Sequence, residues 1–243
     1  MSFQMVFKRY ELKYILTQSQ KEQIVKAMAP YMKLDEYGRT TIRNVYYDTD
    51  DYRLIRKSIE QPVYKEKLRV RSYKQAMGGS TVFVELKKKY QSVVYKRRLA
   101  LAENEAVDWL NRDTPCPVSS QISNEIEYCL DYYESLHPVA FISYEREAYY
   151  ALDESDFRVT FDDTILFRDH DITLEAPVGG EHILPKDLVL MEIKCSGGIP
   201  LWMTGLLSKY GISKTSYSKY GSAYRNLIFQ KMENKTMEEI RYV

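Results

Sequence analysis

Several stretches of the chain alternate between apolar and polar residues, which is the pattern of a half-buried β-strand. The clearest covers residues 65–74, where Leu68 and Val70 share one parity while lysines and arginines occupy the other. Similar alternation predicts strands over residues 5–16, 40–49, 81–89, 92–101, 139–151, 157–163 and 188–195. Several of these strands follow one another through short turns, as at residues 77–80. This succession favours an antiparallel sheet that closes on itself.

Apolar residues at helical spacing predict helices between and after the strands. Thr17, followed three residues later by Gln20, forms a capping box that begins a helix ending near Pro30. Further helices are expected over residues 52–59, 103–112, 120–135 and 201–210, and a last one from residue 218 that includes Met232. We therefore expect a mainly β (α+β) protein whose residues 1–243 form a single domain, with helices outside the sheet and at the C-terminus.

Composition limits the function classes. The 243 residues carry a net charge of only +1, so a site for polyanions requires local clustering and nucleic acid is not expected as a partner. Cys116, Cys129 and Cys195 have neither disulfide nor metal-site spacing. No apolar run reaches the length of a membrane span, and Lys8 comes before any signal-peptide core could form. We expect a cytoplasmic protein.

The polar faces of the predicted strands are charged rather than merely hydrophilic. The pattern Glu-x-Lys, which puts an acid and a base on one face, occurs at Glu11–Lys13, Glu85–Lys87 and Glu192–Lys194. Arg69 and Arg71 share a face in the same way, as do Lys96 and Arg98, whereas Arg97 has the opposite parity. Any one of these pairs is explained by the solvated face of an ordinary sheet. Together they predict a barrel with a charged lumen, which is costly unless a polyanion and a divalent metal fill it.

Lys214 and Lys219 lie at the start of the last predicted helix, where backbone N–H groups favour anions. A capped helix with surface lysines also explains them. No Gly-Gly pair is followed by the Gly-Lys-Ser/Thr of a Walker A loop. His137, His170 and His182 have no ligand spacing, and no Ser/His/Asp arrangement is present.

An ordered set of short motifs runs through the chain, and in this order the chain resembles the VTC (vacuolar transporter chaperone) domain. This domain is the polyphosphate polymerase branch of the triphosphate tunnel metalloenzymes, or CYTH-like superfamily. The resemblance implies an eight-stranded antiparallel β-barrel tunnel with a charged lumen that binds a nucleoside triphosphate and a divalent metal. The motifs are "FKRYELKY" (7–14), "VYYDT" (45–49), "LRVRSY" (68–73), "VFVELKKK" (82–89), "YKRR" (95–98), "SYEREAY" (143–149), "RVTFDDTI" (158–165), "LMEIK" (190–194) and "SKYG" (218–221).

Site residues follow from the resemblance by position. The cations expected to act on the reacting phosphates are Arg69, Arg71, Lys87, Arg158 and Lys219. Further phosphate ligands are Lys13, Lys96, Arg98 and Arg146, to which we add Lys194 from its Glu-x-Lys triplet and Lys214 from the helix start. The carboxylates expected to hold Mn²⁺ or Mg²⁺ are Glu192, Glu85 and Glu11.

The activity that the resemblance implies is metal-dependent transfer of the γ-phosphoryl group of ATP to a growing polyphosphate chain. The partners would be ATP or another nucleoside triphosphate and inorganic polyphosphate. We do not expect the inositol-phosphate-sensing domain or the membrane segment of eukaryotic subunits, which makes a separate membrane protein a further candidate partner. A single Glu-x-Lys in the first strand, in place of the Glu-x-Glu-x-Lys of hydrolytic relatives, favours transfer over hydrolysis. Two alternatives remain open: a triphosphatase or polyphosphatase of the same fold, and a non-catalytic module that binds polyphosphate or nucleotide.

Overall fold

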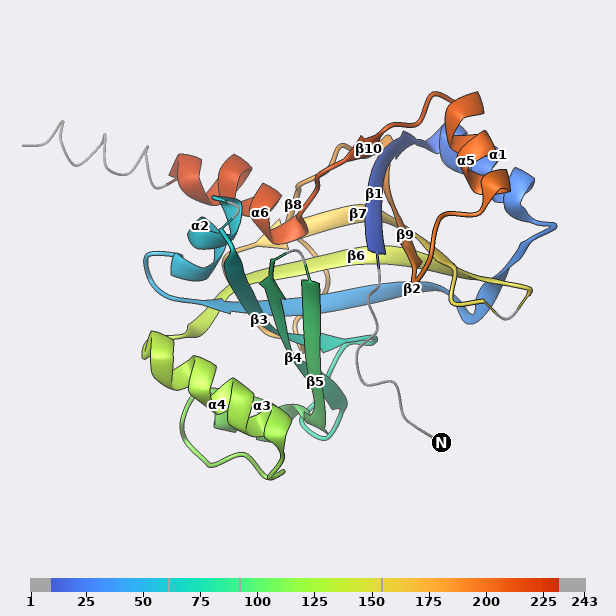
Figure 1. Cartoon of the computed structure of the whole chain (residues 1–243). Helices are drawn as coiled ribbons and strands as arrows, with labels where there is room; N and C mark the ends of the chain where they lie inside the picture. Colours follow the sequence, from blue (N-terminus) through green and yellow to red (C-terminus); the bar gives the residue numbers. More distant parts are fainter. Residues whose placement is uncertain (1–9, 61, 92, 154, 232–243) are drawn as a thin grey trace, which may run out of the picture. The chain divides into compact units, whose positions relative to one another are not determined.

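The structure is a computed structural model that describes residues 10–60, 62–91, 93–153 and 155–231. Predicted strand residues 5–9 and Met232 of the last predicted helix lie outside the described residues. Strands make up most of the regular structure (Figure 1). They are β1 (Tyr10–Thr17), β2 (Met32–Asp48), β3 (Tyr64–Ser72), β4 (Thr81–Tyr90), β5 (Val93–Ala102), β6 (His137–Ala151), β7 (Arg158–Arg168), β8 (Glu181–His182), β9 (Leu188–Cys195) and β10 (Lys214–Thr215).

The helices begin where the sequence predicts them. Thr17 caps α1 as expected, because its hydroxyl accepts from Gln20 N at 3.2 Å while the Gln20 side chain accepts from Thr17 N at 2.9 Å. No helix in the described part of the chain is long and apolar enough to cross a bilayer. The helices are α1 (Gln18–Met28), α2 (Arg53–Ile59), α3 (Glu103–Leu110), α4 (Gln121–Tyr133), α5 (Leu201–Lys209) and α6 (Lys219–Ala223), the last continued by a π-helical turn, η1 (Tyr224–Ile228).

The strand order β10-β1-β9-β7-β6-β2-β3-β4-β5, with β8 beside β7, confirms a mainly β fold, and the ladders described residue by residue are antiparallel. It differs from the expectation in two respects. The described part of the chain forms ten strands rather than eight, because β8 and β10 are two-residue strands too short for an alternating pattern. In the described residues the sheet ends at β10 and β5 without closing. A succession of hairpins specifies which neighbours pair, and it does not specify whether the two ends meet.

The chain divides into two compact units, each with a core of its own. In the described residues, unit 1 consists of residues 10–41, 144–165 and 184–217, and unit 2 of residues 42–143, 166–183 and 218–231. Strands β2, β6 and β7 contribute residues to both units.

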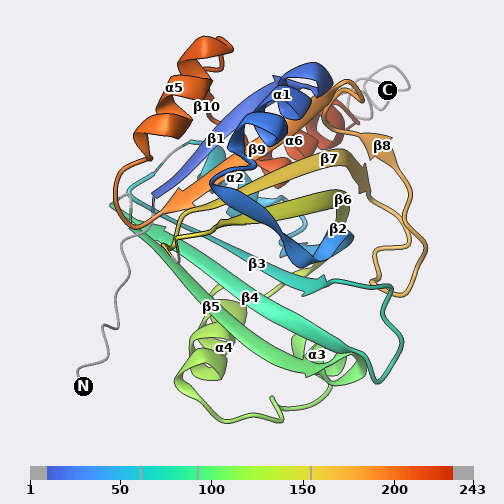
Figure 2. The ribbon, with the colours of Figure 1, turned by 90° about the vertical axis from the view of Figure 1, so that its right-hand side faces the viewer.

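In unit 2, strands β3, β4 and β5 lie side by side with α3 and α4 beside them (Figure 2). Leu68, Val84 and Leu101 belong to the buried face, which packs against Trp109 of α3 and Ile126 of α4. Lys88 and Arg97, which share this buried side, pair with Glu125 of α4 at 3.1 Å. The helices thus cover one face of these strands, and all the remaining cations of β3–β5 fall on the other.

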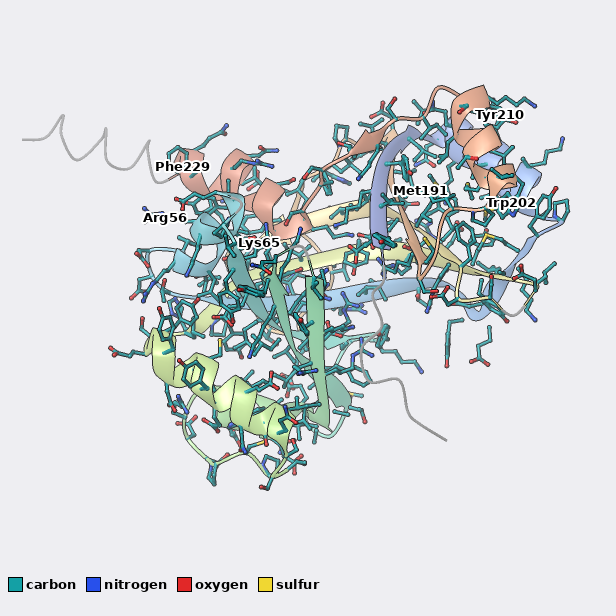
Figure 3. The ribbon with its side chains drawn as sticks, in the orientation of Figure 1. Arg56, Lys65, Met191, Trp202, Tyr210 and Phe229 are labelled. Carbon is teal, nitrogen blue, oxygen red and sulfur yellow. The ribbon has the colours of Figure 1, made fainter. Side chains whose placement is uncertain are left out.

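Unit 1 repeats this division between an apolar and a charged face. Leu16 of β1, Phe161 of β7 and Met191 of β9 are buried in one core, on which Met28 of α1 and Met203 of α5 pack. Figure 3 labels Met191 on β9, together with Trp202 and Tyr210 at the two ends of α5. Because alternate residues of each strand enter this core, Lys13, Thr160 and Glu192 face the other side.

Candidate functional site

Unit 2 carries a strongly basic sheet face, which we call the basic face. The pairing of β3, β4 and β5 arranges its side chains in rows across the three strands, because directly opposite residues point to the same side. One row contains Arg69, Glu85 and Arg98, and the next contains Lys67, Lys87 and Lys96. The basic face therefore holds eight cations and a single carboxylate: Lys65, Lys67, Arg69, Arg71, Lys87, Lys89, Lys96, Arg98 and Glu85. Lys65, at one end of β3, is labelled in Figure 3.

Glu85 lies at the centre of the basic face, only 1% exposed. One carboxylate oxygen, Oε2, accepts from Arg69 Nε at 2.9 Å and from its terminal nitrogen at 2.7 Å. The other oxygen, Oε1, accepts from Arg98 Nε at 2.7 Å and pairs with Lys96 Nζ at 2.8 Å. Both oxygens are thus committed to cations of the neighbouring strands, and these contacts fix the arginine side chains in place.

The electrostatics of this centre follow from its charge balance. Burial by itself raises the pKa of the Glu85 carboxyl, but Arg69, Arg71 and Lys96 outweigh it and hold the pKa far below its ordinary value. Burial, helped by the nearby charges of Arg98 and Arg71, lowers the pKa of Lys96 to about 8 in spite of its contact with Glu85. One carboxylate cannot neutralise the basic face, which therefore favours an anionic ligand.

Two polar residues of β2, which are not among the predicted site residues, extend the basic face. Asn44 accepts a hydrogen bond from Arg71 Nε at 2.9 Å through its side-chain oxygen, and it donates to the Ile142 carbonyl at 2.9 Å. The Tyr46 hydroxyl accepts from Arg69 at 3.0 Å. Both lie at the parity opposite Val45 within "VYYDT" and its preceding residues. Their position opposite Val45 could have predicted that they share a face with Arg69 and Arg71. They were missed because the prediction was based on charged residues, and both side chains are neutral.

The start of α6 is attached to the same unit. Lys67 Nζ donates to the Ser218 hydroxyl at 2.9 Å, immediately before Lys219, which is partly buried. The Tyr220 hydroxyl donates to the buried Asp48 carboxylate at 2.9 Å, and the Tyr220 ring stacks on Tyr46 at 4.7 Å. These contacts bring the "SKYG" segment to the strands that carry Lys67 and Tyr46.

Unit 1 contains the second charged cluster, centred on Glu192 of β9. The Glu192 oxygens lie 3.5 Å from Lys13 Nζ and 3.6 Å from both Arg146 and Lys194. Arg146 also donates two hydrogen bonds of 2.6 Å to the buried carboxylate of Asp162. Arg146 therefore lies on the same side of the sheet as Glu192.

Two predicted phosphate ligands of unit 1 lie apart from Glu192. Arg158 is exposed and its guanidinium is 3.6 Å from Asp35, although its Cα pairs with that of Lys194. Lys214 pairs with Tyr14, whose ring belongs to the core, so the register puts Lys214 on the face opposite Glu192. The structure therefore brings Lys13, Arg146 and Lys194 to Glu192, and it does not bring Lys214 there.

The donor set of unit 1 fits a divalent metal better than that of unit 2. Lys13 Nζ lies 3.4 Å from Glu11 and 3.5 Å from Glu192, so both carboxylates reach one cationic position. Mg²⁺ commonly uses one or two protein carboxylates and completes its shell with water and substrate phosphates. Glu85, with both oxygens bonded to arginine and lysine, does not suit this role. The described residues contain no preformed group of three or more His, Cys, Asp or Glu ligands.

Comparison with known protein families identifies the family of this chain. The model of the VTC domain matches residues 8–228. The chain belongs to the VTC domain family. No curated protein matches this VTC domain chain.

Solved structures confirm the fold of the VTC domain chain. It resembles a candidate adenylate cyclase from Bacillus halodurans with a TM-score of 0.53 and 14% identity, over 87% of this chain and 95% of that one. It also resembles a candidate adenylyl cyclase from Hippeastrum, described as having a dominant triphosphatase activity, with a TM-score of 0.50 and 15% identity, over 88% of this chain and 94% of that one. At such low identity these likenesses show the fold alone.

Proposed function

We propose that the protein is a metal-dependent polyphosphate polymerase, which transfers the γ-phosphoryl group of ATP to a growing polyphosphate chain. The observation that carries this proposal is the basic face of unit 2, where eight cations share one side of three strands with one buried carboxylate. Such a surface is unfavourable by itself and is stabilised by a ligand with several negative charges. Membership of the VTC domain family makes a polyphosphate or triphosphate chain the expected ligand.

Each part of the basic face has a separate task in this proposal. Arg69 and Arg98, which Glu85 holds at fixed positions, present planar donors to phosphate oxygens. Lys67, Lys87 and Lys96 supply compact charges one row further along the strands. Phosphoryl transfer depends mainly on such positioning and charge neutralisation. In unit 1, Glu192 and Glu11 would hold Mn²⁺ or Mg²⁺, which supplies positive charge to phosphate oxygens when bound.

The buried carboxylates of Asp162 and Glu85 support transfer rather than hydrolysis. Hydrolysis needs a group that activates water, whereas the attacking oxygen of a phosphate chain is already anionic and needs no base. Asp162 is bonded by Arg146 and Glu85 by Arg69 and Arg98, so both act as counter-ions. A neutralised counter-ion is a poor general base.

The test is incubation of the protein with ATP and Mn²⁺, followed by gel analysis of the products. Long polyphosphate supports the polymerase. Release of phosphate without a polymer supports a triphosphatase, and binding of tripolyphosphate without any turnover supports a binding module.

Neighbouring residues of β5 provide a matched pair of variants for this test. Arg98 lies on the basic face, whereas Arg97 lies on the opposite side and pairs with Glu125 of α4. Arg98→Ala should reduce polymer synthesis by about two orders of magnitude, and Arg97→Ala should leave it unchanged. Equal loss in both variants would contradict the assignment of the basic face.

A further inference from the structure

The basic face changes character at one end. Moving along β4 from Glu85, the next residue on the same side is Phe83, which pairs with Arg71 on β3 and Ala100 on β5. Beyond Arg71, the same parity continues to Tyr73, directly after the end of β3. The opposite end of the face, the row of Lys65, Lys89 and Val94, carries no ring. Among the described residues of β3–β5, the face therefore has a purely cationic and aliphatic end and an aromatic end.

Tyr73 is held in a definite orientation while its ring stays accessible. Its hydroxyl accepts a hydrogen bond from Arg98 at 3.0 Å, and its ring meets Phe83 edge-on, with centroids 5.6 Å apart and an interplanar angle of 75°. The Arg98 guanidinium lies 4.6 Å from the centre of the Phe83 ring. Phe83 is thus covered by Arg98, whereas Tyr73 remains 41% exposed. An accessible ring fixed by two neighbours loses little conformational freedom when it stacks on a ligand.

The spacing of the rows sets Tyr73 at a suitable distance from the cations. Successive rows on one face are two residues apart, about 6.6 Å along a strand. A triphosphate bound across the rows of Lys87 and Arg98 occupies about this length. Its next substituent then lies at the row of Phe83, beside Tyr73. In a nucleoside triphosphate that substituent is the nucleoside.

We propose that Tyr73 is the stacking platform for the base of a purine nucleoside triphosphate, and that Phe83 and Arg98 orient its ring. This assignment rests on the proposed function, because it takes the basic face to be the triphosphate site. It also fixes the direction of the ligand, with the base at the Tyr73 end and the terminal phosphate toward the row of Lys67, Lys87 and Lys96. A ring face selects by stacking area and is tolerant of base identity. The platform therefore favours purines over pyrimidines and does not separate adenine from guanine.

The experiment compares two ligands by calorimetry, each with the same concentration of Mg²⁺. One is the β,γ-imido analogue of ATP, which has both base and phosphates, and the other is inorganic tripolyphosphate, which has no base. Tyr73→Ala should weaken binding of the ATP analogue by about tenfold, the scale of one base–aromatic stack, and leave tripolyphosphate within about twofold. Tyr73→Phe, which keeps the ring and loses the hydroxyl, should retain most of the preference for the analogue.

Tyr128→Ala is the matched control, because Tyr128 is an exposed tyrosine of the same unit on α4, 68% exposed. It should change neither affinity. Equal loss of both ligands in Tyr73→Ala would overturn the platform, since Tyr73 would then act only through Arg98 on the phosphates. An unchanged affinity for the analogue would overturn it as well, while the phosphate site would stand. If the wild-type protein binds neither ligand, the proposed function fails, and the platform fails with it.

Discussion

The cluster around Glu85 and the cluster around Glu192 grow from the same sequence pattern and differ in their structure. Each glutamate belongs to a Glu-x-Lys triplet on a strand whose other face is apolar. Glu85 accepts arginine hydrogen bonds of 2.7–2.9 Å at both of its oxygens. The contacts of Glu192 with Lys13, Arg146 and Lys194 are longer, at 3.5–3.6 Å.

A second carboxylate explains part of this difference. In unit 1, Arg146 donates from Nε and Nη2 to Asp162 at 2.6 Å, and the same Nη2 lies 3.6 Å from Glu192, so Asp162 is the closer acceptor. In unit 2 no aspartate lies among the paired residues of β3, β4 and β5, and Glu85 alone accepts from two arginines. The same triplet thus produces a structural counter-ion in one unit and a candidate metal ligand in the other, according to the acids on neighbouring strands.

Removing the charge of Glu85 should have the largest effect on the difference between the two clusters. Glu85→Gln leaves Arg69, Arg98 and Lys96 without their common counter-ion, and it should lower the free energy of unfolding by about 3 kcal/mol. Urea denaturation followed by circular dichroism measures this loss, and added tripolyphosphate should restore part of it. Glu192→Gln is the control and should cost less. Equal stability of the two variants would show that the clusters do not differ in this way.

Glu192→Gln tests the other half of the comparison. If Glu192 holds the metal, this variant should still bind tripolyphosphate, while metal-dependent turnover falls by about two orders of magnitude. Polymer synthesis and tripolyphosphate binding are measured side by side on the one variant. Turnover close to wild type, accompanied by altered stability, would make Glu192 a counter-ion like Glu85.

A substitution in the lysine row of the basic face, which contains Lys67, Lys87 and Lys96, should have a smaller effect on stability. Lys87 lies between Lys67 and Lys96 in the pairing, so Lys87→Met relieves repulsion and should raise the free energy of unfolding by about 0.5 kcal/mol. The same change should weaken tripolyphosphate binding about tenfold, because the protein loses one ammonium group that contacts the phosphates. Lys88→Met is the matched control: Lys88 pairs with Glu125 on the opposite side, so its loss should not affect binding. If Lys87→Met lowered both the stability and the affinity, repulsion within the lysine row would be contradicted.

The smallest expected effect is a pH dependence of stability that comes from Lys96. Burial lowers the pKa of this lysine from 10.5 to about 8. Below about pH 8 the lysine is charged in both the folded and the unfolded state. Above that pH the folded protein releases the proton first, so the unfolded state binds more protons and stability rises with pH. Because the side chain is 43% exposed, the rise should be small.

Urea denaturation from about pH 7 to pH 9 tests this sign. Wild type should gain stability over the range relative to Lys96→Met, and its affinity for tripolyphosphate should fall as the ammonium is lost. A difference between the two proteins that stays constant with pH would contradict the shifted pKa.

The sequence by itself determined the elements and their faces. Period-two alternation predicted β3, β4, β5 and β9, because one buried face per strand imposes that period. The Thr17–Gln20 capping box gave the first residue of α1, since both of its bonds are local. Parity also separated Arg98 from Arg97 correctly, and the order of the motifs led to the VTC domain family.

Only the tertiary structure decided which charges meet. The register of β3, β4 and β5 sets Arg69 and Arg98 on either side of Glu85, and that register depends on long-range pairing that a single strand does not encode. Asn44 and Tyr46 joined the basic face for the same reason, whereas Lys214 was turned away from Glu192 by its pairing with Tyr14. The strands β8 and β10 remained hidden because two residues are too few to show a period. Alternation along a strand is a local consequence of burial, while the partner of each charge depends on contacts between distant segments.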